Sequence, residues 1–187
     1  MSPRDRSERL ASLHRGICRC RKCPLHESRT HAVPGEGDTR AVAMMIGEAP
    51  GEKEDLQARP FCGRSGNFLD KVFVDLDMRR EDFYITSTVK CRPPNNRTPA
   101  EREAATCREA WLSRQIECIR PRVIVLLGLT AIRCVLGEKV KLADVHGELR
   151  EVDGTTCLLT YHPTSAMRFP TSEKRFRGDL RKLSDLL

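Results

Sequence analysis

The sequence lacks several features that would assign it to a class at once. No apolar run approaches the roughly 20 residues that a membrane-spanning helix needs, and the charged residues 1–9 contain no apolar segment of a secretory signal. Internal repeats, low-complexity tracts and Ser/Gly-rich linkers are absent as well. We therefore expect a cytoplasmic protein without a membrane partner, folded as one domain over residues 1–187.

The composition excludes further classes. With 32% charged and 39% apolar residues, the chain is neither disordered nor collagen-like nor a coiled coil. Its 33 Lys and Arg against 26 Asp and Glu give a net charge of +7, which suits an acidic polymer such as DNA as a partner. Nine cysteines in a cytoplasmic protein favour metal binding over a disulfide framework.

Short apolar runs alternate with stretches of helical spacing. Strands are predicted at residues 41–47, 83–89, 122–128 and 156–161, and helices after Ser65, from a Thr98-Pro99-Ala100-Glu101 cap to about residue 119, over 130–136 and at the C-terminus. Residues 164–170 are predicted to be a loop. This alternation predicts an α/β fold, a three-layer α/β/α arrangement around a mainly parallel four-stranded sheet. Ligands of such sheets bind beyond the carboxyl ends of the strands.

Four cysteines have a spacing typical of a metal site. Cys20 and Cys23 form a C-x₂-C pair, and Cys91 and Cys107 are separated by fifteen residues. Four thiolates suit Zn²⁺ or an iron–sulfur cluster equally well, and Cys18 competes with Cys20 as a ligand. The alternative is that these candidate ligands are unligated packing residues. Packing is the interpretation we favour for four other cysteines, which lie in or beside apolar runs: Cys62, Cys118, Cys134 and Cys157.

Two glycine-rich segments follow the first predicted strand. Residues 47–55 would present Glu48 and backbone N–H groups to a ligand, unless they form an ordinary surface turn. Residues 59–66 lead into a helix N-terminus, which attracts phosphate, and Gly63 and Gly66 would let a nucleic-acid backbone come close. Phe61 is either a core residue or a platform on which a base stacks.

A third polar motif follows the last predicted strand. His162 at a strand end can donate a hydrogen bond to a developing anion, act as acid or base, or merely cap the strand. The bulky residues Met167, Arg168 and Phe169 follow, either folded onto the core or used as a wedge between stacked bases.

Together these motifs resemble the family 4 uracil-DNA glycosylases from Cys20 to the C-terminal helix. Five segments carry the resemblance: Cys20–Cys23 with Pro24-Leu25, Gly47–Asp55, Pro60-Phe61-x-Gly63 with Ser65-Gly66, Val89–Pro94 with Cys107, and Tyr161-His162-Pro163. The resemblance implies a [4Fe-4S] cluster on Cys20, Cys23, Cys91 and Cys107. It also implies a monomeric, monofunctional enzyme that flips uracil out of single- or double-stranded DNA and leaves an abasic site for base excision repair.

The resemblance also implies residue roles. Glu48 would stabilise the sugar cation and position water, and His162 would hydrogen-bond the oxyanion at O2 of the base. Four residues would contact the base, namely Ala49 through its backbone, Phe61 by stacking, Glu54 near C5, and Ser87 at the N3–O4 edge. The remaining DNA contacts would come from Gly63, Ser65 and Gly66 and from a wedge of Met167 and Arg168.

One position departs from the family. Where an Asn usually reads N3–H and O4 of uracil, this chain has Ser87 after Ile85-Thr86. A hydroxyl offers one donor and cannot span both contacts without water. There are three alternatives to a strictly uracil-specific enzyme. The chain could excise uracil more weakly, it could accept a bulkier modified base, or it could be a non-catalytic DNA-binding or redox-sensing iron–sulfur protein. A related branch of these enzymes is known for trapping its product covalently through a His in an inserted basic loop. The segment after Cys91 contains no His, so covalent trapping is not expected here.

Overall fold

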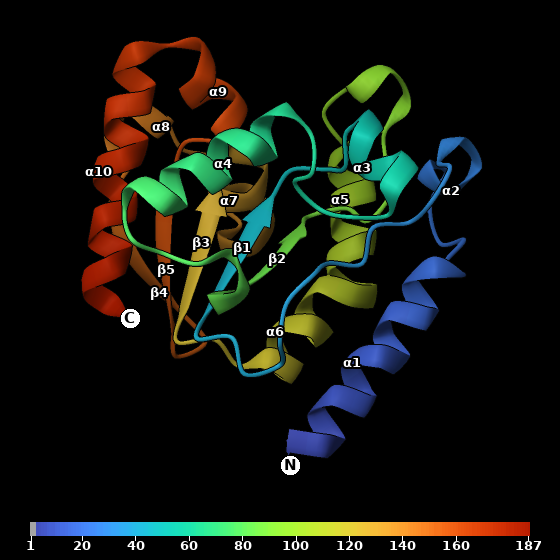
Figure 1. Cartoon of the computed structure of the whole chain (residues 1–187). Helices are drawn as coiled ribbons and strands as arrows, with labels where there is room; N and C mark the ends of the chain where they lie inside the picture. The colour runs from blue at the N-terminus through green and yellow to red at the C-terminus, as the bar shows by residue number, and fades with distance from the viewer. Residues whose placement is uncertain (1–2) are drawn as a thin grey trace.

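The computed structural model describes residues 3–187, in which a central sheet lies between two layers of helices (Figure 1). The strands are β1 (Ala43–Gly47), β2 (Phe83–Ser87), β3 (Val123–Leu127), β4 (Leu149–Val152) and β5 (Thr155–Thr160). The helices are α1 (Pro3–Cys18), α2 (Leu25–Ser28), α3 (Glu52–Gln57), α4 (Arg64–Asp75), α5 (Glu101–Cys107), α6 (Ser113–Ile119), α7 (Leu129–Leu136), α8 (Leu142–Val145), α9 (Pro163–Arg168) and α10 (Pro170–Leu186). The structure also has two short 3₁₀ turns, η1 (Arg80–Asp82) and η2 (Pro94–Asn96), and one π-helical turn, η3 (Arg108–Leu112), among the described residues. None of the described helices combines the length and apolarity needed to cross a membrane.

The sheet has the order β2-β1-β3-β5-β4, and all its pairs are parallel except β4 with β5. Strands β1, β2 and β3 are buried along their whole length, so alternate side chains fill two separate cores. One core lies against α4, α9 and α10 and the other against α1, α5, α6 and α7. The predicted three-layer α/β/α fold is therefore confirmed.

Three local predictions were wrong. The sheet has five strands rather than four, because an exposed edge strand, β4, pairs with β5 across a turn at Asp153-Gly154. Residues 163–168 form α9, with Pro163 in its first turn, where a missing N–H costs nothing. The helix predicted from a cap at Thr98 begins two residues later than expected. Ala100 is the N-cap, and the side chain of Glu103, rather than that of Glu101, accepts the Ala100 backbone N–H.

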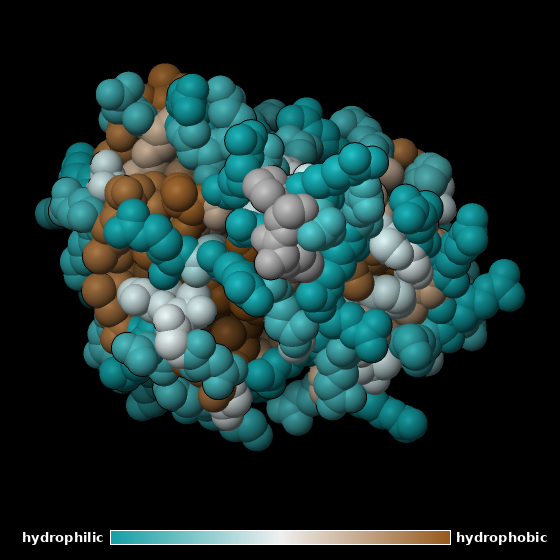
Figure 2. All heavy atoms as spheres, turned by 90° about the horizontal axis from the view of Figure 1, so that it is seen from below, coloured by the Kyte–Doolittle hydropathy of each residue, from teal (hydrophilic) through white to brown (hydrophobic). Residues whose placement is uncertain are grey.

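The carboxyl ends of the parallel strands meet at one end of the molecule, uppermost in Figure 1. Seen from the opposite end, apolar residues gather on the side of α10, whereas the side of α1 is mostly hydrophilic (Figure 2). The segments that follow β1, β2 and β5 are therefore brought together at the upper end, away from this apolar surface.

Gly66, in the first turn of α4, marks a close approach between two segments. A Cβ atom on it would lie 1.8 Å from the carbonyl oxygen of Phe61 and 2.2 Å from its carbonyl carbon. From the sequence we expected this glycine to admit a nucleic-acid backbone. Gly66 is buried, and packing against Phe61 accounts for the glycine without a DNA contact.

We predict that Gly66→Ala destabilises the fold by about 1–3 kcal/mol, because a backbone carbonyl cannot rotate away from the added methyl group. Gly178→Ala is the matched control: Gly178 also lies in a helix, α10, and an added Cβ there meets no atom within 4 Å. Alanine should stabilise that position by up to about 1 kcal/mol. Urea unfolding of both variants measures the difference, and equal shifts would contradict the packing argument.

Candidate functional site

The predicted site residues converge on a cavity of about 600 Å³ at the upper end of the sheet. Of those residues, its walls contain Glu48, Ala49, Glu54, Phe61, Ser65, Ser87, His162 and Arg168. Gly63 and Met167 line a neighbouring hollow that also reaches Ser65 and Arg168. Gly66 lies in neither. A cavity of this size falls within the range of about 300–1,000 Å³ typical of small-ligand sites.

Phe61 forms a buried wall of the cavity. Its backbone has φ 47°, a left-handed conformation that is uncommon for an aromatic residue. Its ring occupies the space beside Gly47, where an added Cβ would lie 2.6 Å from the ring. The ring centroid is 5.8 Å from that of His162, with the planes tilted by 32°. The aromatic ring and the imidazole therefore border the same space.

Glu54 ties two loops together. Its carboxylate accepts hydrogen bonds from the backbone N–H groups of Gly51 at 3.1 Å, Cys62 at 2.9 Å and Gly63 at 2.7 Å. The side chain is buried, so these charge-assisted bonds hold the loop after β1 to the start of α4. Its expected position near C5 of a base stays a prediction.

Glu48 lies just beyond β1 and accepts a short hydrogen bond from the Thr130 hydroxyl. Thr130 lies in the first turn of α7, after β3, and no motif in the sequence singled it out. Glu48 also borders a second cavity between α5 and α7. Thr130 fixes one carboxylate oxygen, so Glu48 presents its charge in a defined orientation.

His162 caps α9, and its Nδ1 accepts the backbone N–H of Thr164 at 3.2 Å. A neutral imidazole whose Nδ1 accepts a hydrogen bond carries its proton on Nε2. Burial lowers the pKa of His162 to about 4, against an opposing attraction from the Glu54 carboxylate. The ring is therefore a neutral Nε2–H donor at physiological pH.

Ser87 is the last residue of β2, buried and level with Gly47 in the sheet register. The ammonium of Lys90, fully buried, donates to the Ser87 carbonyl at 2.7 Å and to the Thr86 hydroxyl at 2.6 Å. The strand end is thus held by backbone contacts, while the Ser87 side chain faces the cavity region.

Cys20, Cys23, Cys91 and Cys107 line one small cavity between α1 and α5, together with Trp111. Among residues 3–187, no three Cys, His, Asp or Glu side chains converge closely enough to hold a single metal ion. Burial raises the pKa of Cys23, Cys91 and Cys107, the last to about 12. Cys18, the rival of Cys20, is exposed and does not line this cavity.

Two N–H donors point at these sulfur atoms. Arg29 donates to Sγ of Cys91 at 2.9 Å and to the carbonyls of Cys18 and Cys20, and the Trp111 indole donates to Sγ of Cys20 at 3.2 Å. Such donors stabilise thiolates and tune metal–sulfur centres. Neither residue was predicted, because each lies far in sequence from the cysteine whose sulfur atom accepts its hydrogen bond.

The cavity rim contains further residues to which the family resemblance gave no role. Pro93, Asn96 and Arg97 reach it from the loop after Cys91, and Phe169 follows the predicted wedge residues. Phe169 is 58% exposed, although an apolar side chain of its size is usually buried. Arg168 is also exposed at this rim, and Met167, which is half-buried, lines the neighbouring hollow.

Comparison with known proteins agrees with this arrangement. The family model of the uracil DNA glycosylase superfamily matches residues 34–184. A type-4 uracil-DNA glycosylase of Archaeoglobus fulgidus is 38% identical, with 96% of this chain and 94% of the relative covered. Those of Pyrobaculum aerophilum and Thermotoga maritima are each 42% identical over 91% of this chain and 91% and 89% of their own. The chain belongs to the uracil-DNA glycosylase superfamily and, within it, to the type-4 enzymes.

Proposed function

We propose that the protein is a monofunctional uracil-DNA glycosylase, which hydrolyses the bond between uracil and deoxyribose and leaves an abasic site for base excision repair. The observation that carries the proposal is the pairing of a neutral imidazole donor, His162, with a carboxylate, Glu48, on one cavity beyond the strand ends. The proposal also includes a single-domain monomer that acts on chromosomal DNA in the cytoplasm.

The base must first leave the stack, at a cost of a few kcal/mol. The exposed Arg168, with Met167 beside it, would fill the vacated space, and backbone groups near Gly63 and Ser65 at the start of α4 would hold phosphate. The extruded uracil would stack on Phe61, a contact typically contributing about 1–3 kcal/mol.

Bond cleavage moves the electron pair of the C1′–N1 bond onto the base. The Nε2–H of His162 would donate to O2, where that charge develops. Glu48 would stabilise the sugar cation, and it would take a proton from the water that adds to C1′. Ala49, beside Glu48 on the cavity wall, would contact the base through its backbone N–H. Glu54 would keep its place by its three backbone bonds and exclude the methyl group of thymine.

The proposal also includes a [4Fe-4S] cluster held by Cys20, Cys23, Cys91 and Cys107. Four irons separate the ligand sulfurs more widely than one ion does, which suits thiols that surround a cavity without converging on one point. The N–H donors of Arg29 and Trp111 are of the kind that such sulfurs accept. The cluster would cross-link the N-terminal segment to the loop after β2, and none of its ligands belongs to the uracil cavity.

We predict that the protein removes uracil from single- or double-stranded oligonucleotides, so that alkali then breaks the strand at the abasic site, whereas matched thymine-containing oligonucleotides stay intact. His162→Ala should lower the single-turnover rate about 10²–10³-fold, because its hydrogen bond strengthens only as charge reaches the base. DNA affinity should stay within a few-fold. DNA binding without cleavage of any deaminated or modified base would instead support a non-catalytic binding protein.

We predict that Ser87→Asn raises uracil excision by about one to two orders of magnitude, because two directed hydrogen bonds at roughly 0.5–1.5 kcal/mol each replace one short donor. The longer side chain should also penalise a base enlarged at its C4–C5 edge. Single-turnover rates on both bases in both proteins measure this. If neither rate changes, Ser87 does not set specificity, and a bound water already reads uracil.

We predict that Cys91→Ala loses iron, visible charge-transfer absorption and thermal stability, whereas Cys118→Ala retains the metal. Cys118 is equally buried, but its thiol donates to the Arg6 carbonyl, away from the cysteine cavity. The wild-type chain should contain about four irons. Stoichiometric zinc in the wild type, or full stability of colourless Cys91→Ala, would contradict the structural cluster.

A further inference from the structure

The backbone of Phe61 needs external support. A left-handed φ at a bulky residue costs on the order of 1–3 kcal/mol and persists only where neighbouring groups impose it. Pro60 restricts the chain on one side, and buried Gly66 lies against the Phe61 carbonyl on the other. Neither contact holds the carbonyl groups of this segment by hydrogen bonds.

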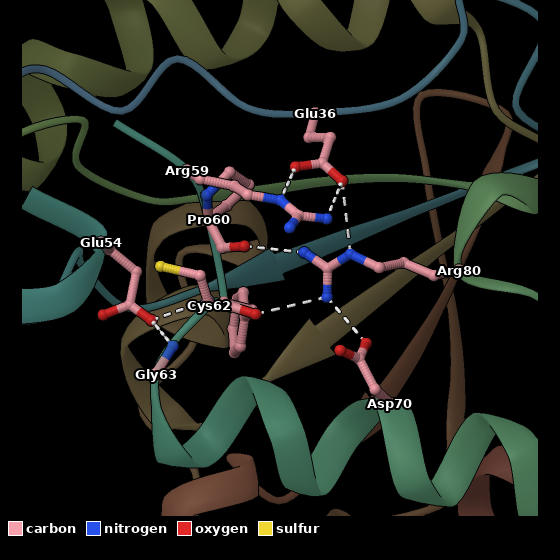
Figure 3. Close-up of polar contacts among 9 residues, drawn as sticks. Glu36, Glu54, Arg59, Pro60, Cys62, Gly63, Asp70 and Arg80 are labelled. Atoms are coloured by element: carbon pink, nitrogen blue, oxygen red, sulfur yellow. Dashed lines mark hydrogen bonds and ion pairs between the residues drawn. The ribbon is translucent and has the colours of Figure 1, made fainter. Parts of the chain in front are cut away.

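Arg80 provides those hydrogen bonds from outside the predicted motifs. It begins η1, on the connection between α4 and β2, and its guanidinium donates to the Pro60 carbonyl at 2.7 Å and to the Phe61 carbonyl at 3.3 Å (Figure 3). One planar group thus contacts two successive carbonyls of the segment that carries the aromatic wall.

Two carboxylates fix the same guanidinium. Asp70, on α4, accepts from it at 2.8 Å, and Glu36 lies 3.4 Å away. Glu36 also pairs with Arg59, the residue before Pro60, so the network returns to the same segment (Figure 3). The Arg80 side chain is only 16% exposed, against 69% for its neighbour Arg79.

The segment is held on its other side by Glu54, which accepts the N–H groups of Cys62 and Gly63. Arg80 binds the carbonyls of residues 60 and 61, and Glu54 binds the amides of residues 62 and 63, so the two side chains hold successive parts of one segment. Figure 3 shows Arg80 and Glu54 on opposite sides of Pro60 and Cys62. A fork of five N–H donors can serve two carbonyls and two carboxylates together, whereas a lysine has three donors at one point.

We propose that Arg80 is a positioning residue for base recognition: it holds the left-handed Phe61 so that its ring faces the flipped base beside His162. Arg80 itself does not line the cavity. The inference rests on the proposed uracil glycosylase activity, and it adds a residue that acts only through Phe61.

A double-mutant cycle tests this proposal. We expect Arg80→Met and Phe61→Ala each to lower the single-turnover rate on uracil by roughly 5- to 100-fold, the range that one lost stacking contact spans. The double variant should be no slower than Phe61→Ala alone. Arg79→Met is the matched control. Among the described residues, the Arg79 side chain pairs with Glu81 and Asp82, away from the Phe61 segment, so this variant should keep the rate within two-fold.

Thermal unfolding of all four variants separates positioning from stability. If Arg80 were merely structural, Arg80→Met would lower the melting temperature but leave the rate per folded molecule unchanged, or the rate losses of the two single variants would add in the double variant. Either of these two rate results would overturn the proposal. If Arg80→Met fails to fold, Arg80→Lys replaces it. We expect Arg80→Lys to lower the single-turnover rate several-fold and to be inhibited less by free uracil, because a displaced Phe61 ring would bind the base more weakly. A wild type inactive on uracil would instead refute the proposed function itself.

Discussion

The site depends on two adjacent carboxylates of α3 that accept backbone N–H groups of distant loops. Glu54 binds the amides of residues 51, 62 and 63, and Asp55 binds those of Thr30 and His31. Both side chains are buried, where such charge-assisted bonds are strong and their loss is costly. One short helix therefore fixes both the loop that carries Phe61 and the segment beside the cysteine cavity.

This arrangement separates chemistry from recognition. Glu48 is the residue after β1 and His162 lies two residues beyond β5, so the sheet sets their relative positions. Phe61 lies on a loop whose backbone is bonded by the side chains of Glu54 and Arg80. In the proposed function, recognition of the base could therefore change through these loop contacts while the carboxylate and the imidazole keep their places.

The sequence predicted what local patterns determine. Fully apolar runs identified β1 and β3. The parallel sheet predicted from all the strands placed Glu48, Ser87 and His162, which end or follow β1, β2 and β5, at one edge, where they line one cavity. Edge strand β4 has no buried face to create a pattern, and the prolines around α9 resemble those of a loop. The partners Thr130 and Arg80 were missed because tertiary packing, which no local pattern records, brings them to the site.

The departure at Ser87 is compatible with this architecture because the strand end is held through its backbone. Buried Lys90 bonds the Ser87 carbonyl and the Thr86 hydroxyl, and the next residue, Cys91, faces the cysteine cavity. None of these contacts involves the Ser87 hydroxyl. The side chain at this position can therefore vary between Asn and Ser without moving the strand or the cysteine next to it. Under the proposed function, such a change would alter how the base edge is read.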